Sequence, residues 1–292
     1  MTLPGTSRRW MLAALLLGGG IGLAQTPAPP PAPAPAPAAN AEPSWIAAIK
    51  PDLPTLFVAG DSTAKNGDRL GWGDPFSDYF DLTRINVANA ARAGRSARTF
   101  FNEGLWQRIV DHMKPGDYVL IQFGHNDGGA PDKRPFRGDV PGIGEETQSV
   151  TMPNGTTDVV HSFGWYIRKF INDTKAKGAH PIVMSCTVRN IWTDGKIERH
   201  MGNFREWSKQ VADAENVPYM DFTEIAADRF EQMGQEQVKP LFPIDHTHTS
   251  PVGADLNASL VVSGLKAMKS PLTNYLSAKG EAVAAYTPHA AE

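Results

Sequence analysis

The stretch Tyr118-Val-Leu-Ile-Gln-Phe123 decides the fold of this chain. It is a short apolar run that ends at Gly124, and such a run is typical of a strand buried on both faces of a sheet. Four other short runs share this pattern, at 55–60, 85–88, 181–186 and 217–222. The sequence therefore predicts a sheet of five buried strands.

Helical patterns lie between these strands, at 96–113, 162–177, 203–216 and 251–268. Alternation of strands and helices indicates a parallel sheet covered by helices on both faces. We therefore expect an α/β fold, a three-layer α/β/α sandwich around a five-stranded parallel sheet. Residues 128–160 show no clear pattern, and irregular stretches of that length are usually functional or mobile loops.

The composition is that of a globular protein, with 41% hydrophobic and 20% charged residues among 292. A net charge of −3 without a basic cluster argues against a nucleic-acid partner. The single cysteine, Cys186, excludes an intramolecular disulfide and any multi-cysteine metal site. Because Cys186 lies in a predicted strand, we expect it to be buried and inert.

The N-terminus has the features of an export signal. Arg8 and Arg9 precede an uncharged run at 10–24, which indicates a secretory signal cleaved after Ala24. The paired arginines also resemble a twin-arginine signal, so the export route stays open, as does an uncleaved anchor. An alternation of Pro and Ala follows and predicts an extended spacer. We expect a signal peptide at 1–24, a linker at 25–44, one domain at 45–275 and a tail at 276–292.

Export without disulfides fits a bacterial periplasm or the exterior. Once the signal is cleaved, we expect no stable membrane association, and we expect a monomer.

Polar segments follow the first three predicted strands, and ligands bind at the carboxyl ends of strands in open α/β sheets. In Gly60-Asp61-Ser62-Thr63, a serine hydroxyl at a strand end is placed for nucleophilic attack. In the segment 89–96, Gly94 can aim its backbone N–H at a developing oxyanion. In Gly124-His125-Asn126-Asp127, the side-chain amide of Asn126 is a neutral donor that can stabilise the same negative charge. Each segment alone is better explained by an ordinary turn or helix cap, and we expect Ser96 to cap the helix that follows.

A fourth segment, Asp245-His246-Thr247-His248, supplies an acid–base pair. The spacing lets Asp245 hold the tautomer of His248, whose other nitrogen is then free as a base towards Ser62. Alternatively, Asp245, His246 and His248 are metal ligands. No other His or Cys spacing in the chain supports that alternative.

In this order the four segments resemble the blocks of the SGNH (GDSL-like) hydrolase superfamily. Within it, the sequence is similar to the rhamnogalacturonan acetylesterases, carbohydrate esterases of family 12 that deacetylate pectin. Gly60-Asp-Ser-Thr63 and Asn89-x-Ala91-x-x-Gly94-Arg95-Ser96 carry this likeness, together with Gly124-His-Asn-Asp127. So do Arg137-Gly138, the segments 142–148 and 181–192, and Asp245-x-x-His248. The resemblance covers about 56–267.

The resemblance implies a flavodoxin-like SGNH hydrolase fold and a serine esterase mechanism. It makes Ser62 the nucleophile, His248 the base and Asp245 the residue that orients His248. The oxyanion hole is then formed by the N–H groups of Ser62 and Gly94 and the side chain of Asn126. Neither a metal nor an organic cofactor is implied.

The implied substrate is an acetylated plant cell-wall polysaccharide, above all pectic rhamnogalacturonan. The alternatives are another SGNH activity (acetylxylan esterase, lipase or thioesterase) and a non-catalytic carbohydrate-binding protein on the same scaffold.

Sugar binding requires further groups. Trp72, Trp165 and Trp192 are candidates for stacking on sugar rings, although we expect Trp165 to be a core residue. Arg95, Arg137 and Arg189 are candidates for pairing with galacturonate carboxylates.

Overall fold

The computed structural model describes residues 43–67 and 69–288. The predicted signal peptide at 1–24 and the predicted linker up to residue 42 lie outside the described residues. Within the described part, no helix is both long enough and apolar enough to cross a membrane.

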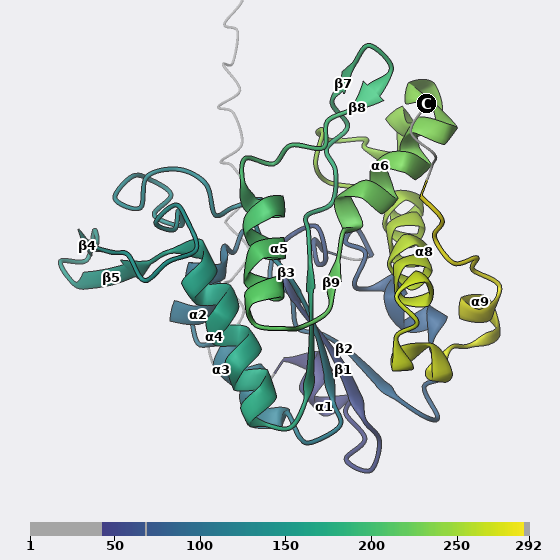
Figure 1. The fold of residues 1–292 in the computed structure, drawn as a ribbon, viewed down its shortest axis with the longest axis horizontal. Helices are drawn as coiled ribbons and strands as arrows, with labels where there is room; N and C mark the ends of the chain where they lie inside the picture. Colours follow the sequence, from purple (N-terminus) through teal and green to yellow (C-terminus); the bar gives the residue numbers. More distant parts are fainter. Residues whose placement is uncertain (1–42, 68, 289–292) are drawn as a thin grey trace, which may run out of the picture. The chain divides into compact units, whose positions relative to one another are not determined.

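A parallel sheet of five strands forms the centre, in the order β2-β1-β3-β6-β9. Helices α2, α3, α4 and α5 cover one face of the sheet, and α6 and α8 cover the other (Figure 1). This arrangement confirms the predicted three-layer sandwich. The strands are β1 (Thr55–Gly60), β2 (Asn86–Asn89), β3 (Tyr118–Gln122), β6 (His180–Met184) and β9 (Tyr219–Met220).

The side chains of β1 show why the sheet is covered on both faces. All six residues of β1 are buried. Leu56 and Val58 point into the core on the α6/α8 face, and Phe57 and Ala59 point into the core on the other face. Each fully buried side chain of this size contributes about 1.5–3 kcal/mol relative to exposure. The sequence of a strand that is buried on both faces is therefore a continuous run of apolar residues.

The register of the sheet places the predicted polar segments together at the carboxyl end of the strands. Gly60 of β1 pairs with Gln122 of β3, and Gln122 pairs with Met184 of β6. The loops that follow these three strands therefore begin side by side. Asn89 ends β2 next to them, opposite Val58.

Three of the four predicted helices have the expected extent, and the first does not. They are α4 (Phe163–Ala176), α5 (Phe204–Ala214) and α8 (Pro251–Ala267). The pattern at 96–113 forms two helices, α2 (Ala97–Asn102) and α3 (Leu105–His112). Gly104 between them has φ +71°, a left-handed conformation that interrupts the helical hydrogen bonds. As expected, Ser96 caps α2, and its side chain accepts a hydrogen bond from the N–H of Thr99.

Several elements were not predicted from the sequence. Helix α6 (Phe222–Met233) takes up the end of the run predicted as the fifth strand, so β9 has only two residues. The stretch at 128–160 contains an antiparallel hairpin of β4 (Thr147–Thr151) and β5 (Thr157–His161). A smaller hairpin joins β7 (Trp192–Thr193) and β8 (Lys196–Ile197). The short elements are α1 (Ser44–Ala47), η1 (Pro75–Tyr79), α7 (Gln235–Val238), η2 (Lys239–Leu241), η3 (Pro271–Tyr275) and α9 (Ala278–Glu281).

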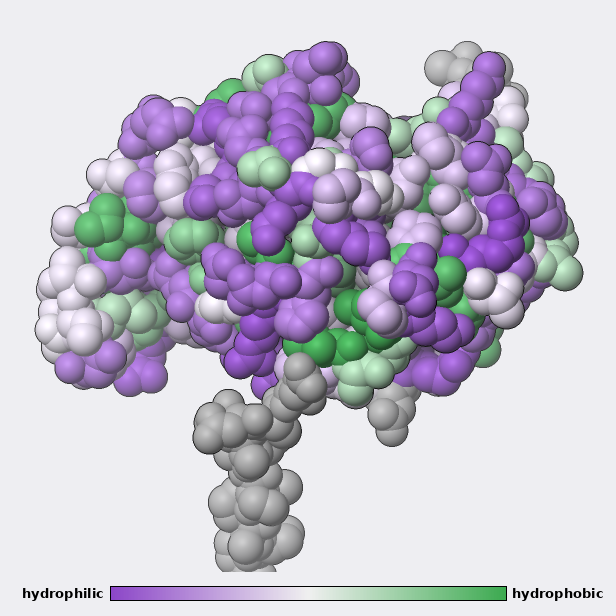
Figure 2. Space-filling model, turned by 90° about the horizontal axis from the view of Figure 1, so that it is seen from below, coloured by the Kyte–Doolittle hydropathy of each residue, from purple (hydrophilic) through white to green (hydrophobic). Residues whose placement is uncertain are grey.

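The segment after residue 275 packs on the domain. The backbone N–H of Tyr286 donates to the carbonyl of Ser263 in α8, and its phenol donates to Asp228 in α6. On the face shown in Figure 2, apolar residues form small patches among hydrophilic ones.

Candidate active site

Ser62 lies in a tight turn directly after β1. Oδ1 of the buried Asp61 accepts hydrogen bonds from the N–H of Thr63 at 2.8 Å and from its hydroxyl at 2.8 Å, which fixes the turn. The turn does not lead directly into a helix, because the next helical element is η1, which begins at Pro75. The turn leaves Ser62 7% exposed at the carboxyl end of the sheet, where the loops after β1, β3 and β6 begin side by side.

His248 and Asp245 approach Ser62 from the loop that precedes α8. Nε2 of His248 lies 2.9 Å from Oγ of Ser62, and Nδ1 lies 2.7 Å from Oδ2 of Asp245. Oδ1 of Asp245 accepts hydrogen bonds from the N–H groups of Thr247 and His248. The structure therefore joins the three residues predicted as nucleophile, base and orienting acid in one hydrogen-bonded chain.

The pKa of Asp245 favours the ionised form. Desolvation acts to raise this pKa, but hydrogen bonds from the side chain and N–H of His248 and from Thr247 outweigh it and lower the pKa to about 2. An ionised Asp245 accepts from Nδ1–H of His248, and the lone pair of Nε2 then faces the Ser62 hydroxyl.

The predicted oxyanion donors lie on the loops after β2 and β3. Gly94 has φ +75°, which an L side chain adopts only with strain. The side-chain amide of Asn126 donates a hydrogen bond to the carbonyl of Arg95 at 3.1 Å, and this bond ties the two loops together. The amide has a second N–H that this bond does not use. Asn126 is buried, with 8% exposure.

A pair of buried carboxyl groups, Asp127 and Asp139, supports these loops. Asp127 accepts hydrogen bonds from the N–H of Ala97 at 2.7 Å and from that of Gly124 at 2.8 Å. Desolvation raises the pKa of Asp127, and desolvation together with the adjacent Asp127 charge raises that of Asp139 well above the usual range. Neither side-chain oxygen of Asp139 has a hydrogen-bond partner in the described structure, and its raised pKa favours the protonated form. No sequence pattern pointed to this pair.

Gln122 at the end of β3 is a second residue that the sequence analysis missed. Its Oε1 accepts from the indole N–H of Trp72 at 2.9 Å, and its amide donates to the carbonyl of Ser185 at 2.9 Å. The hydroxyl of Thr63, next to Ser62, lies 3.3 Å from the same Oε1. Gln122 therefore connects the serine turn to β6. A polar residue within an otherwise apolar strand was the available signal.

The predicted sugar-stacking role of Trp72 is wrong, because Trp72 is fully buried under Gln122. Trp165, expected to be a core residue, is only partly buried: it packs against the core, and its ring stacks on that of His161 with centroids 3.7 Å apart. Trp192 is half-buried, and its indole N–H donates to Asn190.

The three candidate arginines have different environments. Arg95 forms an ion pair with Glu103, whereas Arg137 and Arg189 line a cavity beside His125 and Asn126. Cys186 is buried as expected, and desolvation raises the pKa of its thiol.

The surroundings of the two histidines bear on the alternative hypothesis that Asp245, His246 and His248 bind a metal. Both ring nitrogens of His248 face protein groups, Asp245 and Ser62, and His246 lies on an exposed part of the loop. Among the residues that the structure describes, no three His, Cys, Asp or Glu side chains are grouped as metal ligands.

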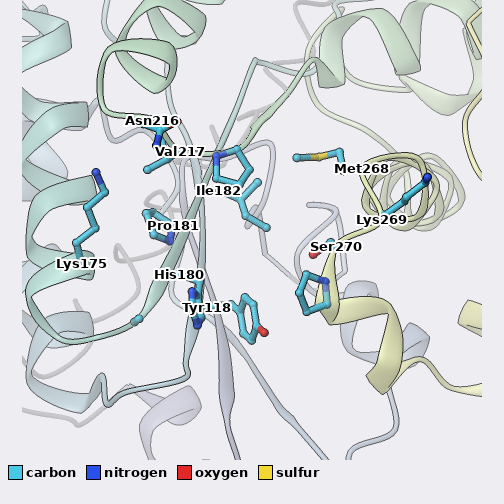
Figure 3. Close-up of a pocket in the computed structure, with 13 residues that line it drawn as sticks. Tyr118, Lys175, His180, Pro181, Ile182, Asn216, Val217, Met268, Lys269 and Ser270 are labelled. Carbon is cyan, nitrogen blue, oxygen red and sulfur yellow. The ribbon is translucent and has the colours of Figure 1, made fainter.

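A mainly apolar cavity of about 460 Å³ lies at the amino end of the parallel strands, opposite to the end where Ser62 lies (Figure 3). Tyr118 and His180, which line it, are the first residues of β3 and β6. Because Ser62 follows the last residue of the parallel strand β1, this cavity lies at the other end of the strands from the serine. None of the predicted catalytic residues lines it.

Comparison with known proteins shows which family has this arrangement. The model of the GDSL-like Lipase/Acylhydrolase family matches residues 58–256, a range that contains Ser62 and His248. The chain belongs to this family. It is a carboxylic ester hydrolase.

Two relatives and one solved structure illustrate the likeness. The rhamnogalacturonan acetylesterase of Emericella nidulans is 37% identical over 204 residues, which cover 70% of this chain and 81% of that protein. The rhamnogalacturonan acetylesterase RhgT of Bacillus subtilis is 31% identical over 241 residues, 76% of this chain and 93% of that one. The crystal structure of YxiM from Bacillus subtilis has a TM-score of 0.60 at 26% identity, and the match covers 75% of this chain and 58% of that chain.

Proposed function

We propose that this acetylesterase removes O-acetyl groups from a pectic polysaccharide, rhamnogalacturonan, with Ser62 as its nucleophile. The observation that carries the proposal is the hydrogen-bonded chain from Asp245 through His248 to Ser62. A base within 2.9 Å of a serine hydroxyl, itself held by a carboxylate, is the arrangement that serine esterases use.

In the proposed reaction, Oγ of Ser62 attacks the acetyl carbonyl while Nε2 of His248 takes its proton. The negative charge on the carbonyl oxygen is stabilised by the N–H groups of Ser62 and Gly94 and by the amide of Asn126. Collapse of this intermediate releases the sugar hydroxyl, which receives the proton from His248. Water activated by His248 then hydrolyses the acetyl-enzyme and releases acetate.

The identity of the substrate is supported by the relatives, two of which are rhamnogalacturonan acetylesterases over most of their length. An enzyme that acts on a cell-wall polysaccharide has to reach it outside the cell. We propose that residues 1–24 direct this export.

The experiment is acetate release from acetylated rhamnogalacturonan and from acetylxylan, with Ser62→Ala as control. We expect release from the pectic substrate and none from the variant. Serine-dependent release from acetylxylan alone would overturn the substrate. Release that survives the loss of Ser62 would overturn the mechanism. Binding without release by the wild-type protein would favour a non-catalytic carbohydrate-binding protein.

A further inference from the structure

A polar cavity of about 500 Å³ adjoins the proposed active site, a size typical of small-ligand sites. His125 and Asn126, from the loop after β3, form one wall. The remaining wall residues come from the loop after β3 and from the segment that runs from the end of β6 to Phe204, the first residue of α5. Asn126 is also a proposed oxyanion donor, so a ligand in this cavity lies next to the reacting ester.

Three arginines line this cavity: Arg134, Arg137 and Arg189. No carboxylate among the described residues lies within 4.0 Å of any of their guanidinium nitrogens. Arg137 makes one long hydrogen bond, 3.4 Å, to the carbonyl of Gly94. Nε of Arg189 is buried and has no hydrogen-bond partner in the described structure. Arg199 and Arg205, which line another pocket, are by contrast paired with Asp and Glu side chains.

The charge of this cavity is therefore unbalanced. Glu198 is the one carboxylate in its lining, against three guanidinium groups. Like charges in a shared cavity repel each other, and an unpartnered buried N–H loses its hydration without compensation. An anion with several acceptor oxygens removes both costs, and a planar carboxylate matches the guanidinium fork.

The cavity is also coupled to the catalytic histidine. The ring of His125, which lines the cavity, is close enough to both Arg189 and His248 for their charges to lower its pKa. Its Nε2 is 2.8 Å from the hydroxyl of Thr187, and burial lowers its pKa, so it adds no positive charge to the wall. The positive charge is thus concentrated on the arginines.

We propose that this cavity is a subsite for the carboxylate of a uronic acid residue, held by Arg189 and Arg137 with Arg134 at the entrance. The acetyl ester would be on the same sugar or on a neighbouring one. This assignment rests on the proposed function, and it adds the charge of the substrate as the property that the enzyme recognises.

The test compares an acetylated galacturonate oligosaccharide with its methyl-esterified form, which has the same sugars without the charge. We expect kcat/KM of the wild-type enzyme to favour the acidic form, and this preference to weaken at high salt. Arg189→Gln and Arg137→Gln should each lower the preference about 10-fold. Arg189→Lys should retain part of it. Arg229→Gln, an exposed arginine of α6 outside the cavity, should leave it unchanged.

Binding to the Ser62→Ala variant separates this inference from the proposed function. Trigalacturonate without acetyl groups should bind to Ser62→Ala, and the added Arg189→Gln change should weaken this binding about 10-fold. Equal loss of acidic and esterified ligands would overturn the carboxylate subsite, as would no loss with either. If the wild-type enzyme releases no acetate but trigalacturonate binding still depends on Arg189, the proposed reaction fails and the subsite stands.

Discussion

Nε2 of His248 lies 2.9 Å from Oγ of Ser62, although 186 residues separate them in the chain. Two sets of local hydrogen bonds hold these residues in position. Asp61 fixes the turn after β1, and Asp245 accepts three hydrogen bonds from its own loop, one of them from the His248 ring. The packing of α8 on the sheet, and a hydrogen bond from the hydroxyl of Thr249 to the carbonyl of Leu70, then place the His248 loop beside the segment that follows Ser62. The proposed base and nucleophile are therefore in hydrogen-bond contact.

Asp245→Asn should lower kcat by about 10³–10⁴-fold, because an amide next to Nδ1 no longer selects the tautomer whose Nε2 accepts the serine proton. Steady-state kinetics on acetylated rhamnogalacturonan measure this loss. Asp213→Asn, an exposed carboxylate of α5, is the matched control and should retain full activity. Full activity of Asp245→Asn would remove Asp245 from the mechanism.

Asn126→Ala should lower kcat by about 10²–10³-fold with little change in KM, because a donor to the oxyanion acts mainly in the transition state. The variant also loses the hydrogen bond to Arg95, so circular dichroism must accompany the kinetics. Asn154→Ala, in the exposed turn between β4 and β5, is the control. A rise in KM at unchanged kcat would show that Asn126 binds the ground state instead.

Gln122→Met should lower the free energy of unfolding by about 2–4 kcal/mol. The substitution leaves the buried indole N–H of Trp72 and the carbonyl of Ser185 without a partner, and each such loss costs about 1–3 kcal/mol. Urea denaturation measures it. Gln107→Met, on the exposed face of α3, should change stability little. Equal effects of the two substitutions would contradict the role given to Gln122.

Asp139→Asn should change how stability depends on pH. The pKa of Asp139 is raised in the folded state, so the native protein retains a proton that the unfolded chain releases near pH 4. Above pH 4 and up to the folded pKa, this proton makes the wild-type lose about 1.4 kcal/mol of stability per pH unit. The amide of the variant does not titrate, so this contribution should disappear. Urea unfolding at pH 5, 6 and 7 measures both slopes, and identical slopes would contradict a proton held by the pair.

The layers of the fold follow from local sequence. A strand such as β1, buried on both faces, reads as an unbroken apolar run, and this property made the sheet predictable. The division of 96–113 into two helices depends on the left-handed conformation of Gly104, which the helical periodicity of its neighbours conceals. Helix α6 was missed because its first residue, Phe222, continues the apolar run of β9.

The polar segments of the site were predictable because they follow directly after strands, where the chain must turn. The supporting groups were not. Asp127 and Asp139 are 12 positions apart with an irregular loop between them, and no spacing rule links them. Trp72 was a candidate for sugar stacking, but its indole is buried and donates to Gln122. Because Gln122 is 50 residues away, the sequence near Trp72 does not show this hydrogen bond.

The measurement that tests the central claim most directly is covalent labelling with a fluorophosphonate, which reacts with serines activated by a neighbouring base. Peptide mass spectrometry should place one adduct on Ser62, and Ser62→Ala should acquire none. His248→Ala should react far more slowly at the same position. An adduct on another residue, or labelling of Ser62 at an equal rate without His248, would contradict the account.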